Sequence, residues 1–178
     1  MPSLLLHSQD PYWSPQELTT LIKPLHDLGL VSTSSGERQT SVYWAGENFL
    51  SLVMFLGCSP QVQLDPRSAA DDQAVCSVHF HVYPGVTFLS AAKRPVARCK
   101  QCRTPVTDER QAGVETVFTC EQCGEVAQAI DLDWRRAAGF GRCFIEIAGI
   151  YPQEAVPSDK LLNALASYSG DSWQYFFV

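Results

Sequence analysis

Two identical cysteine frames constrain this chain more than any other feature of its sequence. The segments Cys99-Lys-Gln-Cys102 and Cys120-Glu-Gln-Cys123 share the pattern Cys-x-x-Cys, and seventeen residues separate them. Two cysteines at this spacing can hold one ion from a tight turn, called a knuckle. Two knuckles together supply the four sulfurs of a tetrahedral zinc site. Because the spacing occurs twice, it is a strong indication of metal binding, and we predict one metal site formed by these four cysteines.

The residues around the two frames resemble the zinc-ribbon family, in which two knuckles on neighbouring β-hairpins hold one metal. The resemblance rests on RCKQC and TCEQCGE, covers about residues 96–129, and carries nothing about the remaining chain. It implies Cys99, Cys102, Cys120 and Cys123 as the ligands. Gly124 fits the glycine that follows the second knuckle. Arg103 occupies the corresponding position after the first knuckle, where glycine would be sterically favoured. A turn around Gly113 and the strand-like VETVFT would bring the second pair back to the first.

The ligand set limits the chemistry of the metal. Four cysteines fill a tetrahedron and leave no open position for water, which argues against a hydrolytic zinc site. We predict one structural Zn²⁺ that stabilises a segment too small to fold on its own core. Iron in a rubredoxin-like site is an alternative, and we prefer zinc because the two frames show little of the symmetry expected there. Thiol–disulfide exchange is a rarer alternative, because a redox Cys-x-x-Cys usually stands alone at a helix N-terminus.

Length and composition indicate a folded protein outside the membrane. The 178 residues fit one domain, or one domain with a small insertion. Apolar residues make up 46% of the chain and charged residues 18%, which is enough for a substantial core. The longest apolar stretch, residues 49–58, is about half the length of a membrane-spanning helix. The N-terminus has no basic residue before its apolar triplet, unlike a signal peptide. Cysteine pairs in such a chain are typical of a reducing compartment, so we expect a cytoplasmic protein.

The order of predicted elements favours an α+β fold with a mixed β-sheet, helices packed on one face and an inserted zinc-ribbon-like β-hairpin. Residues 1–92 and 134–178 would form a discontinuous α+β domain around an insertion at residues 93–133. One helix is expected to begin at the Ser14-Pro15 cap, to be kinked or split at Pro24, and to end at Gly29. A second helix is expected between a Ser158 cap and Gly170.

Strands are expected at residues 41–46, 74–85, 143–152 and 172–178. Residues 49–58 fit either a strand or a buried helix, because they are apolar but poor in β-branched side chains. Residues 131–143 are expected to form a linker or a short helix broken by glycines. The last strand, helix and strand along the chain can form a β-α-β unit.

Charge is distributed unevenly along the chain. The formal net charge is −6, which argues against general nucleic-acid binding because phosphate contacts need lysine and arginine. Between Lys93 and Arg136, however, eight basic residues outnumber seven acidic ones. Five of the basic residues form a cluster without an acid among them. This cluster is either a solvated surface or a contact for an acidic protein or a phosphate. Its members are Lys93, Arg94, Arg98, Lys100 and Arg103.

The catalytic candidates are few. His79 and His81 lie two residues apart in a predicted strand and therefore point to one face, either as an ordinary polar pair or as part of a second metal site. Cys76 lies nearby but has the opposite parity, so it would point away from such a site. Glu146 interrupts an apolar strand, so it is either a carboxylate with a raised pKa or an outward-facing side chain. Cys58 and Cys143 border apolar strands and are expected to be buried.

Three hypotheses follow from these observations. The first, which we prefer, is a non-catalytic interaction or regulatory protein with a structural four-cysteine zinc site and a partner with an acidic surface. The second is an enzyme with a pocket in the α+β domain that uses His79, His81 and Glu146. The third is nucleic-acid binding through the basic ribbon, which the net charge disfavours. The sequence does not indicate an oligomeric state.

Overall fold

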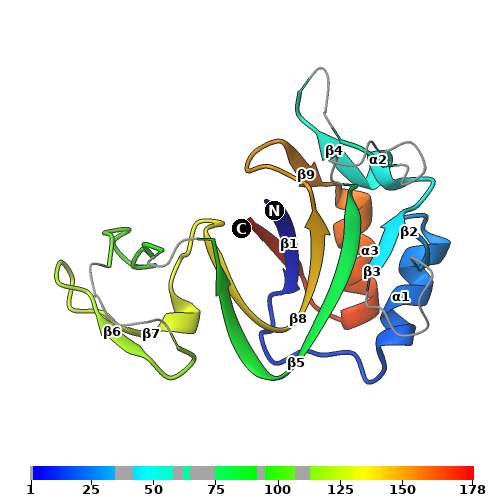
Figure 1. The fold of residues 1–178 in the computed structure, drawn as a ribbon. Helices are drawn as coiled ribbons and strands as arrows, with labels where there is room; N and C mark the ends of the chain where they lie inside the picture. Colours follow the sequence, from blue (N-terminus) through cyan, green and yellow to red (C-terminus); the bar gives the residue numbers. More distant parts are fainter. Residues whose placement is uncertain (1, 35–41, 58–61, 65–74, 92–94, 107–112) are drawn as a thin grey trace.

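The computed structural model of the chain describes residues 2–34, 42–57, 62–64, 75–91, 95–106 and 113–178. Its main body is a curled six-stranded sheet with helices beside it, and the cysteine frames lie in a separate lobe at one end of the sheet (Figure 1). The fold is therefore of the α+β kind. In the described part of the chain, no helix is long and apolar enough to cross a membrane.

Every strand pair that joins the six strands is antiparallel, so the prediction of a mixed sheet with parallel and antiparallel pairs is wrong. Strand β1 lies between the edge strand β10 and the central strand β8, and it was not predicted. Both faces of β1 are buried, so its sequence, SLLLHS, has no apolar–polar alternation to mark it as a strand. The strand order is β10 (Trp173–Phe177), β1 (Ser3–Ser8), β8 (Ala138–Ala148), β5 (Ser77–Ser90), β3 (Val42–Ala45) and β2 (Val31–Ser34).

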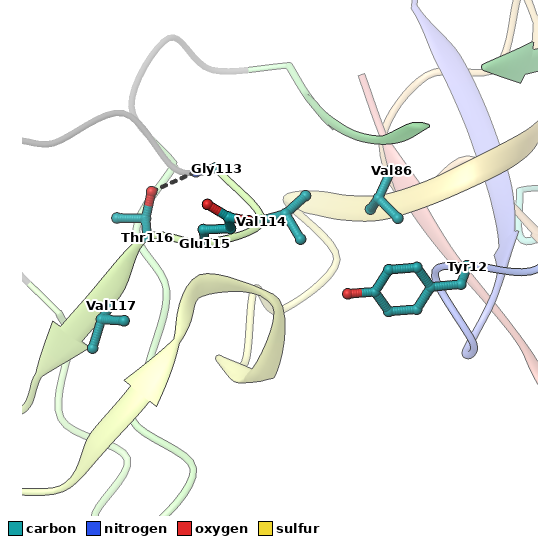
Figure 2. A pocket seen from close by; sticks show the side chains of 7 residues that line it. All are labelled: Tyr12, Val86, Gly113, Val114, Glu115, Thr116 and Val117. Carbon is teal, nitrogen blue, oxygen red and sulfur yellow. Dashed lines mark hydrogen bonds between the residues drawn. The ribbon is translucent and has the colours of Figure 1, made fainter. Parts of the chain in front are cut away.

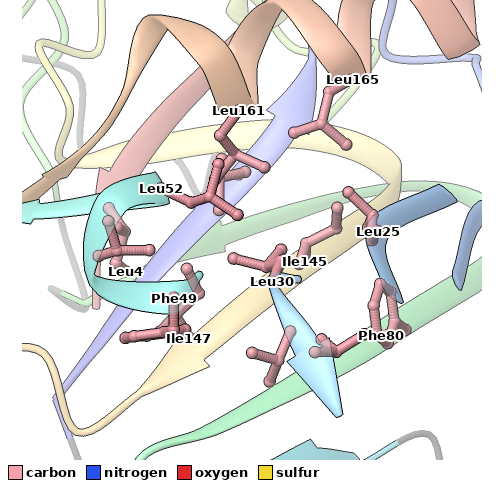
Figure 3. Close-up of a cluster of buried hydrophobic side chains, with 14 of the residues drawn as sticks. Leu4, Leu25, Leu30, Phe49, Leu52, Phe80, Ile145, Ile147, Leu161 and Leu165 are labelled. Carbon is pink, nitrogen blue, oxygen red and sulfur yellow. The ribbon is translucent and has the colours of Figure 1, made fainter. Parts of the chain in front are cut away.

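Helices α1 (Leu18–Asp27), α2 (Phe49–Leu52) and α3 (Asp159–Ser169) cover one face of the sheet. Strand residues such as Phe80, Ile145 and Ile147 point into this layer and join a single hydrophobic cluster with buried helix side chains (Figure 3). The helix contribution comes from Leu21, Leu25, Phe49, Leu52, Leu161 and Leu165. The prediction of helices on one face is confirmed by this shared core.

The first helix begins later than predicted. Its N-cap is Glu17 rather than Ser14, and no side chain caps it. The ring of Trp13 packs on Trp173 and Tyr168, at centroid distances of 5.4 and 5.9 Å, so tertiary packing rather than a local cap positions the chain just before the helix. Pro24 lies inside the helix without dividing it.

Residues 49–58, which fitted either a strand or a helix, contain both within the described part. The short helix α2 is followed at once by β4 (Val53–Phe55), which pairs with β9 (Ala155–Pro157) in a small second sheet. Helix α3 agrees with prediction at both ends. The Ser158 hydroxyl accepts a bond from the Leu161 amide, and Gly170 adopts the left-handed conformation with φ 78°.

The prediction of a linker or broken helix over residues 131–143 holds up to the turn before Ala138 and is wrong from Ala138 onward. Strand β8 begins at Ala138 and includes both Gly139 and Gly141. A Cβ atom on Gly139 would lie 2.6 Å from the Phe176 ring and 2.8 Å from the His7 ring, so any other residue would force these rings to move. Glycine marks a close contact in this strand, not the end of an element. The segments β8, α3 and β10 also form the expected β-α-β unit, with β1 between its two strands.

The cysteine lobe comprises the described residues from Pro95 to Arg136. It contains β6 (Val117–Thr119), β7 (Val126–Gln128) and a single 3-10 turn, Ala129–Asp131. The lobe joins the sheet where β5 ends and β8 begins (Figure 1). Its small hydrophobic core, which includes Phe118, Leu132 and Trp134, also contains Ala138 and Phe140 of β8. The lobe is therefore packed against the end of the β5–β8 pair.

Candidate metal centre

The four predicted cysteines converge in the cysteine lobe. Their sulfur atoms all lie within 4.8 Å of one another. The Cys99 and Cys123 sulfurs are 3.7 Å apart, and those of Cys102 and Cys120 are 3.4 Å apart. A tetrahedron with metal–sulfur bonds of about 2.3 Å has edges of about 3.8 Å. The arrangement is compatible with one metal ion held by all four cysteines, and none of the four is in a disulfide.

The two turns that carry the cysteines have the same backbone hydrogen bonds. In the first, the Cys99 amide donates to the Thr104 carbonyl and the Arg103 amide donates to the Cys99 carbonyl, both at 2.9 Å. In the second turn, the corresponding bonds are Cys120 to Glu125 and Gly124 to Cys120, both at 2.8 Å. The two turns are thus alike in backbone structure. We preferred zinc over iron because the two frames differ in sequence. This difference lies in their side chains and not in their backbone hydrogen bonds.

Arg103 and Gly124 occupy equivalent positions, and both have left-handed backbone angles, with φ 65° and 73°. Only glycine adopts this conformation without a steric cost. The second turn therefore contains the residue that its geometry favours, and the first turn does not. The ion pair between Arg103 and Asp133, with an N–O distance of 3.2 Å, helps to hold the first turn in place.

Electrostatics within the cluster favour a cation. Hydrogen bonds from the Thr104 hydroxyl and amide lower the pKa of Cys102 to about 6. The Glu125 amide lowers the pKa of Cys123 in the same way, but loss of hydration and the three neighbouring thiols outweigh it and raise that pKa to about 12. The Cys102 thiolate therefore forms readily, whereas deprotonation of Cys123 is unfavourable. A bound cation removes this opposition, because metal ligation requires deprotonated cysteines.

Backbone bonds and one tryptophan fix the knuckles to the rest of the lobe. Arg98 and Asp133 exchange two backbone hydrogen bonds, of 2.8 and 3.0 Å, immediately before Cys99. The Trp134 indole donates to the Ala129 carbonyl at 2.8 Å. Its ring packs at 4.9 Å from that of Phe88 at the end of β5. These contacts link the metal centre to the β5–β8 pair.

The remaining described cysteines have no metal-binding geometry. Cys143 is buried as predicted, and burial raises its pKa to about 12. Cys76 is buried in the main core, where burial followed by the charge of Glu154 raises its pKa to about 12. It therefore lies on the opposite side of the sheet from the predicted histidines, as its parity indicated. Cys58 lies outside the described residues.

The structure brings the three catalytic candidates together on the face of the sheet away from the helices. The His81 Nε2 lies 2.7 Å from one oxygen of Glu146, and the Ser3 hydroxyl donates to the other at 2.6 Å. His79 bonds Ser77 instead, at 2.8 Å. The hydrogen bond from His81 is the main cause that lowers the pKa of Glu146 to about 2, so the raised carboxylate pKa that we considered is wrong.

His79, His81 and Glu146, which we call the histidine cluster, lack the ligand grouping of a metal site and the cleft of a catalytic site among the described residues. Among the described residues, only the four lobe cysteines form a group of three or more potential ligands close enough to hold an ion. Neither of the two described clefts is lined by His79, His81 or Glu146. Burial lowers the pKa of His79, which favours its neutral form. The cluster is satisfied internally by its own hydrogen bonds.

The basic cluster predicted from sequence is only partly described. Lys93 and Arg94 lie outside the described residues. Lys100 and Arg103 are exposed, whereas Arg98 is half-buried where it pairs with Asp133 through the backbone. Sequence reasoning missed Arg135 and Arg136, which lie with Lys100 and Arg103 along one cleft. The consecutive arginines in DWRRAAG were the available signal for them.

Beside their shared core, two clefts lined by described residues lie between the cysteine lobe and the sheet. The smaller, of about 940 Å³, is open and has Tyr12 on one side and residues 113–117 on the other (Figure 2). The larger, of about 1470 Å³, lies between the lobe, the β8 end and β10. The smaller cleft has Glu115 as its one charged described side chain, and the larger one is rich in charged groups of both signs.

Comparisons with protein families, with curated proteins and with solved structures give no match to this chain.

Proposed function

We propose that this chain is a zinc-binding, non-catalytic interaction protein in which one structural Zn²⁺ holds the cysteine lobe together. The observation that carries the proposal is the convergence of four sulfur atoms within 4.8 Å of one another. Four thiolates complete the zinc shell and leave no position for a substrate or a reactive water. The role open to such an ion is to stabilise the surrounding chain.

The size of the lobe supports a structural ion. Its strands β6 and β7 have three residues each, and an isolated two-stranded hairpin is marginal in water. Its core is small and partly borrowed from β8. A metal that joins the two knuckles supplies the missing constraint. We accordingly retain residues 93–133 as the proposed inserted zinc ribbon, and the reduced cysteines fit the proposed cytoplasmic location.

The proposed partner is a protein with an acidic surface. Exposed Lys100 and Arg103 lie beside the metal centre, on a chain whose overall net charge is −6. A local basic surface on an acidic protein favours a local acidic partner over nucleic acid, because extended phosphate chains would be repelled elsewhere. The histidine cluster supports the enzyme alternative less well, because it lines neither described cleft.

Metal content tests the proposal directly. Protein purified without chelator should contain about one zinc per chain by elemental mass spectrometry. The Cys120→Ser variant should lose the metal and the structure of the lobe while the sheet remains partly folded. Cys143→Ala is the matched control, because it also removes a buried thiol but leaves the four lobe sulfurs intact.

The outcomes separate the alternatives. Iron at about one per chain would indicate a rubredoxin-like site. About two zincs per chain would bring the histidine cluster back as a second metal site. A metal-free protein would contradict a structural zinc and would favour thiol–disulfide chemistry. A folded and metal-replete Cys120→Ser variant would contradict the claim that this cysteine helps the metal hold the lobe together.

A further inference from the structure

The larger cleft gathers four of the five basic side chains in the described lobe. It runs between the cysteine lobe and strand β10, with a volume of about 1470 Å³. Four basic and three acidic side chains line it. The basic ones come from the first knuckle and from the turn that precedes β8, so two separate segments contribute to one surface. They are Lys100, Arg103, Arg135 and Arg136.

Three of these side chains occupy backbone positions that disfavour them. In the described chain, four non-glycine residues have positive φ, and three of them are Arg103, Arg135 and Arg136, at 65°, 50° and 60°. Arg135 and Arg136 are the central pair of a tight turn closed by the Ala137 amide and the Trp134 carbonyl at 2.9 Å. Turns with positive φ at both central residues usually contain asparagine and glycine there. Arginine at all three positions along one cleft indicates a use for the side chains.

The cleft leaves much of this positive charge available. Asp133 forms an ion pair with Arg103 at 3.2 Å and accepts a bond from the Arg135 amide at 3.0 Å. Among the described residues, the side chains of Lys100, Arg135 and Arg136 form no ion pair. Arg136 instead lies over the ring of Tyr175, 4.4 Å from its centroid. An arginine fork in such a place can bind a carboxylate with two parallel hydrogen bonds.

Strand β10 adds backbone groups to the same cleft. It is an edge strand and pairs only with β1. Ser3 and Val178 exchange two backbone hydrogen bonds, both of 2.9 Å. The backbone N–H and C=O groups of every second residue, counted back from Val178, therefore point to β1, and those of the residues between them point outward. The Phe177 amide confirms this by donating outward to the Arg136 carbonyl at 3.3 Å. The next outward residue, Tyr175, lines the cleft and presents its peptide groups to an incoming chain.

From these features we infer that the cleft binds an extended acidic segment of the partner protein. The inference rests on the proposed interaction function and specifies its partner. The segment would pair with the outward peptide groups of Tyr175, as in strand addition, and its carboxylates would meet Arg135, Arg136 and Lys100. Asp10, Asp131 and Asp133 line the same cleft and repel any anion placed beside them. A peptide can place spaced carboxylates away from these aspartates, whereas nucleic acid has a phosphate on every nucleotide, so an acidic peptide fits better.

A binding selection on the zinc-loaded full-length chain tests this inference. Random peptides displayed on phage should enrich for sequences with aspartate or glutamate between β-branched residues. The best peptide, labelled with fluorescein, is then titrated by fluorescence anisotropy. The double variant Arg135→Gly with Arg136→Gly should weaken its binding at least about tenfold.

Glycine replacements make this test independent of folding. Glycine suits the positive φ of both positions, so the double variant should melt at the same temperature as the wild type or higher. The matched control is Lys23→Ala with Lys160→Ala, which removes the same number of positive charges from exposed helix positions outside the cleft. This control should bind the peptide as the wild type does.

Three outcomes would overturn the inference. They are a selection that yields no acidic sequences, a double glycine variant that binds the peptide normally, and single-stranded oligothymidine that competes for the same arginines and binds more tightly. The zinc content of the same preparation distinguishes failure here from failure of the proposed function. A chain with about one zinc and no peptide binding would retain its structural metal and lose only this docking site.

Discussion

Single residues decide much of the local structure through backbone conformation and burial. Gly124 and Arg103 occupy equivalent knuckle positions with nearly the same φ, although only glycine suits that angle. Position 139 lies within strand β8, and glycine occupies it because a Cβ atom there would overlap Phe176 and His7. The close contact at Gly139 also encloses His7, whose ring packs between Phe144 and Phe176. His7 is thus a titratable group held in the interior.

The pH dependence of stability should report on His7. Burial lowers its pKa from 6.5 to about 4, although backbone contacts with Ser8 and Phe140 offset part of this effect. Between these values the unfolded state binds more protons, so the free energy of unfolding should fall as the pH is lowered from 6.5 to 4. A shift of this size corresponds to about 3 kcal/mol when complete.

Urea denaturation of wild type and His7→Leu at several pH values between 4 and 7 measures this effect. The variant should show a flatter dependence, because leucine cannot take up the proton. Glu146 acts in a lower range: its pKa is lowered to about 2, so its stabilising contribution is present above pH 4.5 and is lost only as the pH falls towards 2. Equal slopes for the two proteins between pH 5 and 6.5 would contradict a buried neutral His7.

Secondary-structure elements differ in how far their own residues determine their ends. Helix α3 has a local start signal that the structure uses, the Ser158 hydroxyl. Helix α1 has an equally good signal in Ser14-Pro15, but it begins at Leu18 after the packing of Trp13 on the core. The same local motif therefore has different outcomes because tertiary contacts intervene in one case.

Two alanine substitutions test this contrast. Ser158→Ala should lower the free energy of unfolding by about 1 kcal/mol, because the Leu161 amide loses its side-chain acceptor. Ser14→Ala should change it by less than about 0.5 kcal/mol, because Ser14 is not the helix cap. Urea denaturation of the two variants under one condition gives both values. A larger effect at Ser14 would show that the predicted cap forms in solution.

At the scale of the whole molecule, the sequence predicted features that depend on short spacing and missed those that depend on distant packing. The cysteine cluster, helix α3 and the face shared by His79 and His81 follow from periodicity and motif alone. Strand β1 escaped prediction because both its faces are buried, and the start of β8 escaped because its glycines resemble a loop. The larger cleft joins residues from His7 to Tyr175, which no local pattern could bring together.

Removal of the metal should show how the lobe and the sheet depend on each other. The lobe has a small core of its own, whereas the main core draws on three helices and the sheet. A strong zinc chelator should therefore increase amide exchange in the second knuckle, at Cys120 and Gly124, whose bonds hold that turn closed. Amides in the β1–β8 ladder should stay protected, because these strands pair within the main sheet.

Hydrogen exchange followed by mass spectrometry, before and after chelation, measures both regions at once. Restored protection on adding zinc back would show that the change is reversible and caused by the ion. Because Trp134 and Phe140 connect the lobe core to β8, partial loss of protection is expected near Ala138 and should fade along the strand. Loss of protection throughout β1 would mean that lobe and sheet unfold as one unit. Unchanged exchange at Cys120 would mean that the ion does not stabilise the lobe.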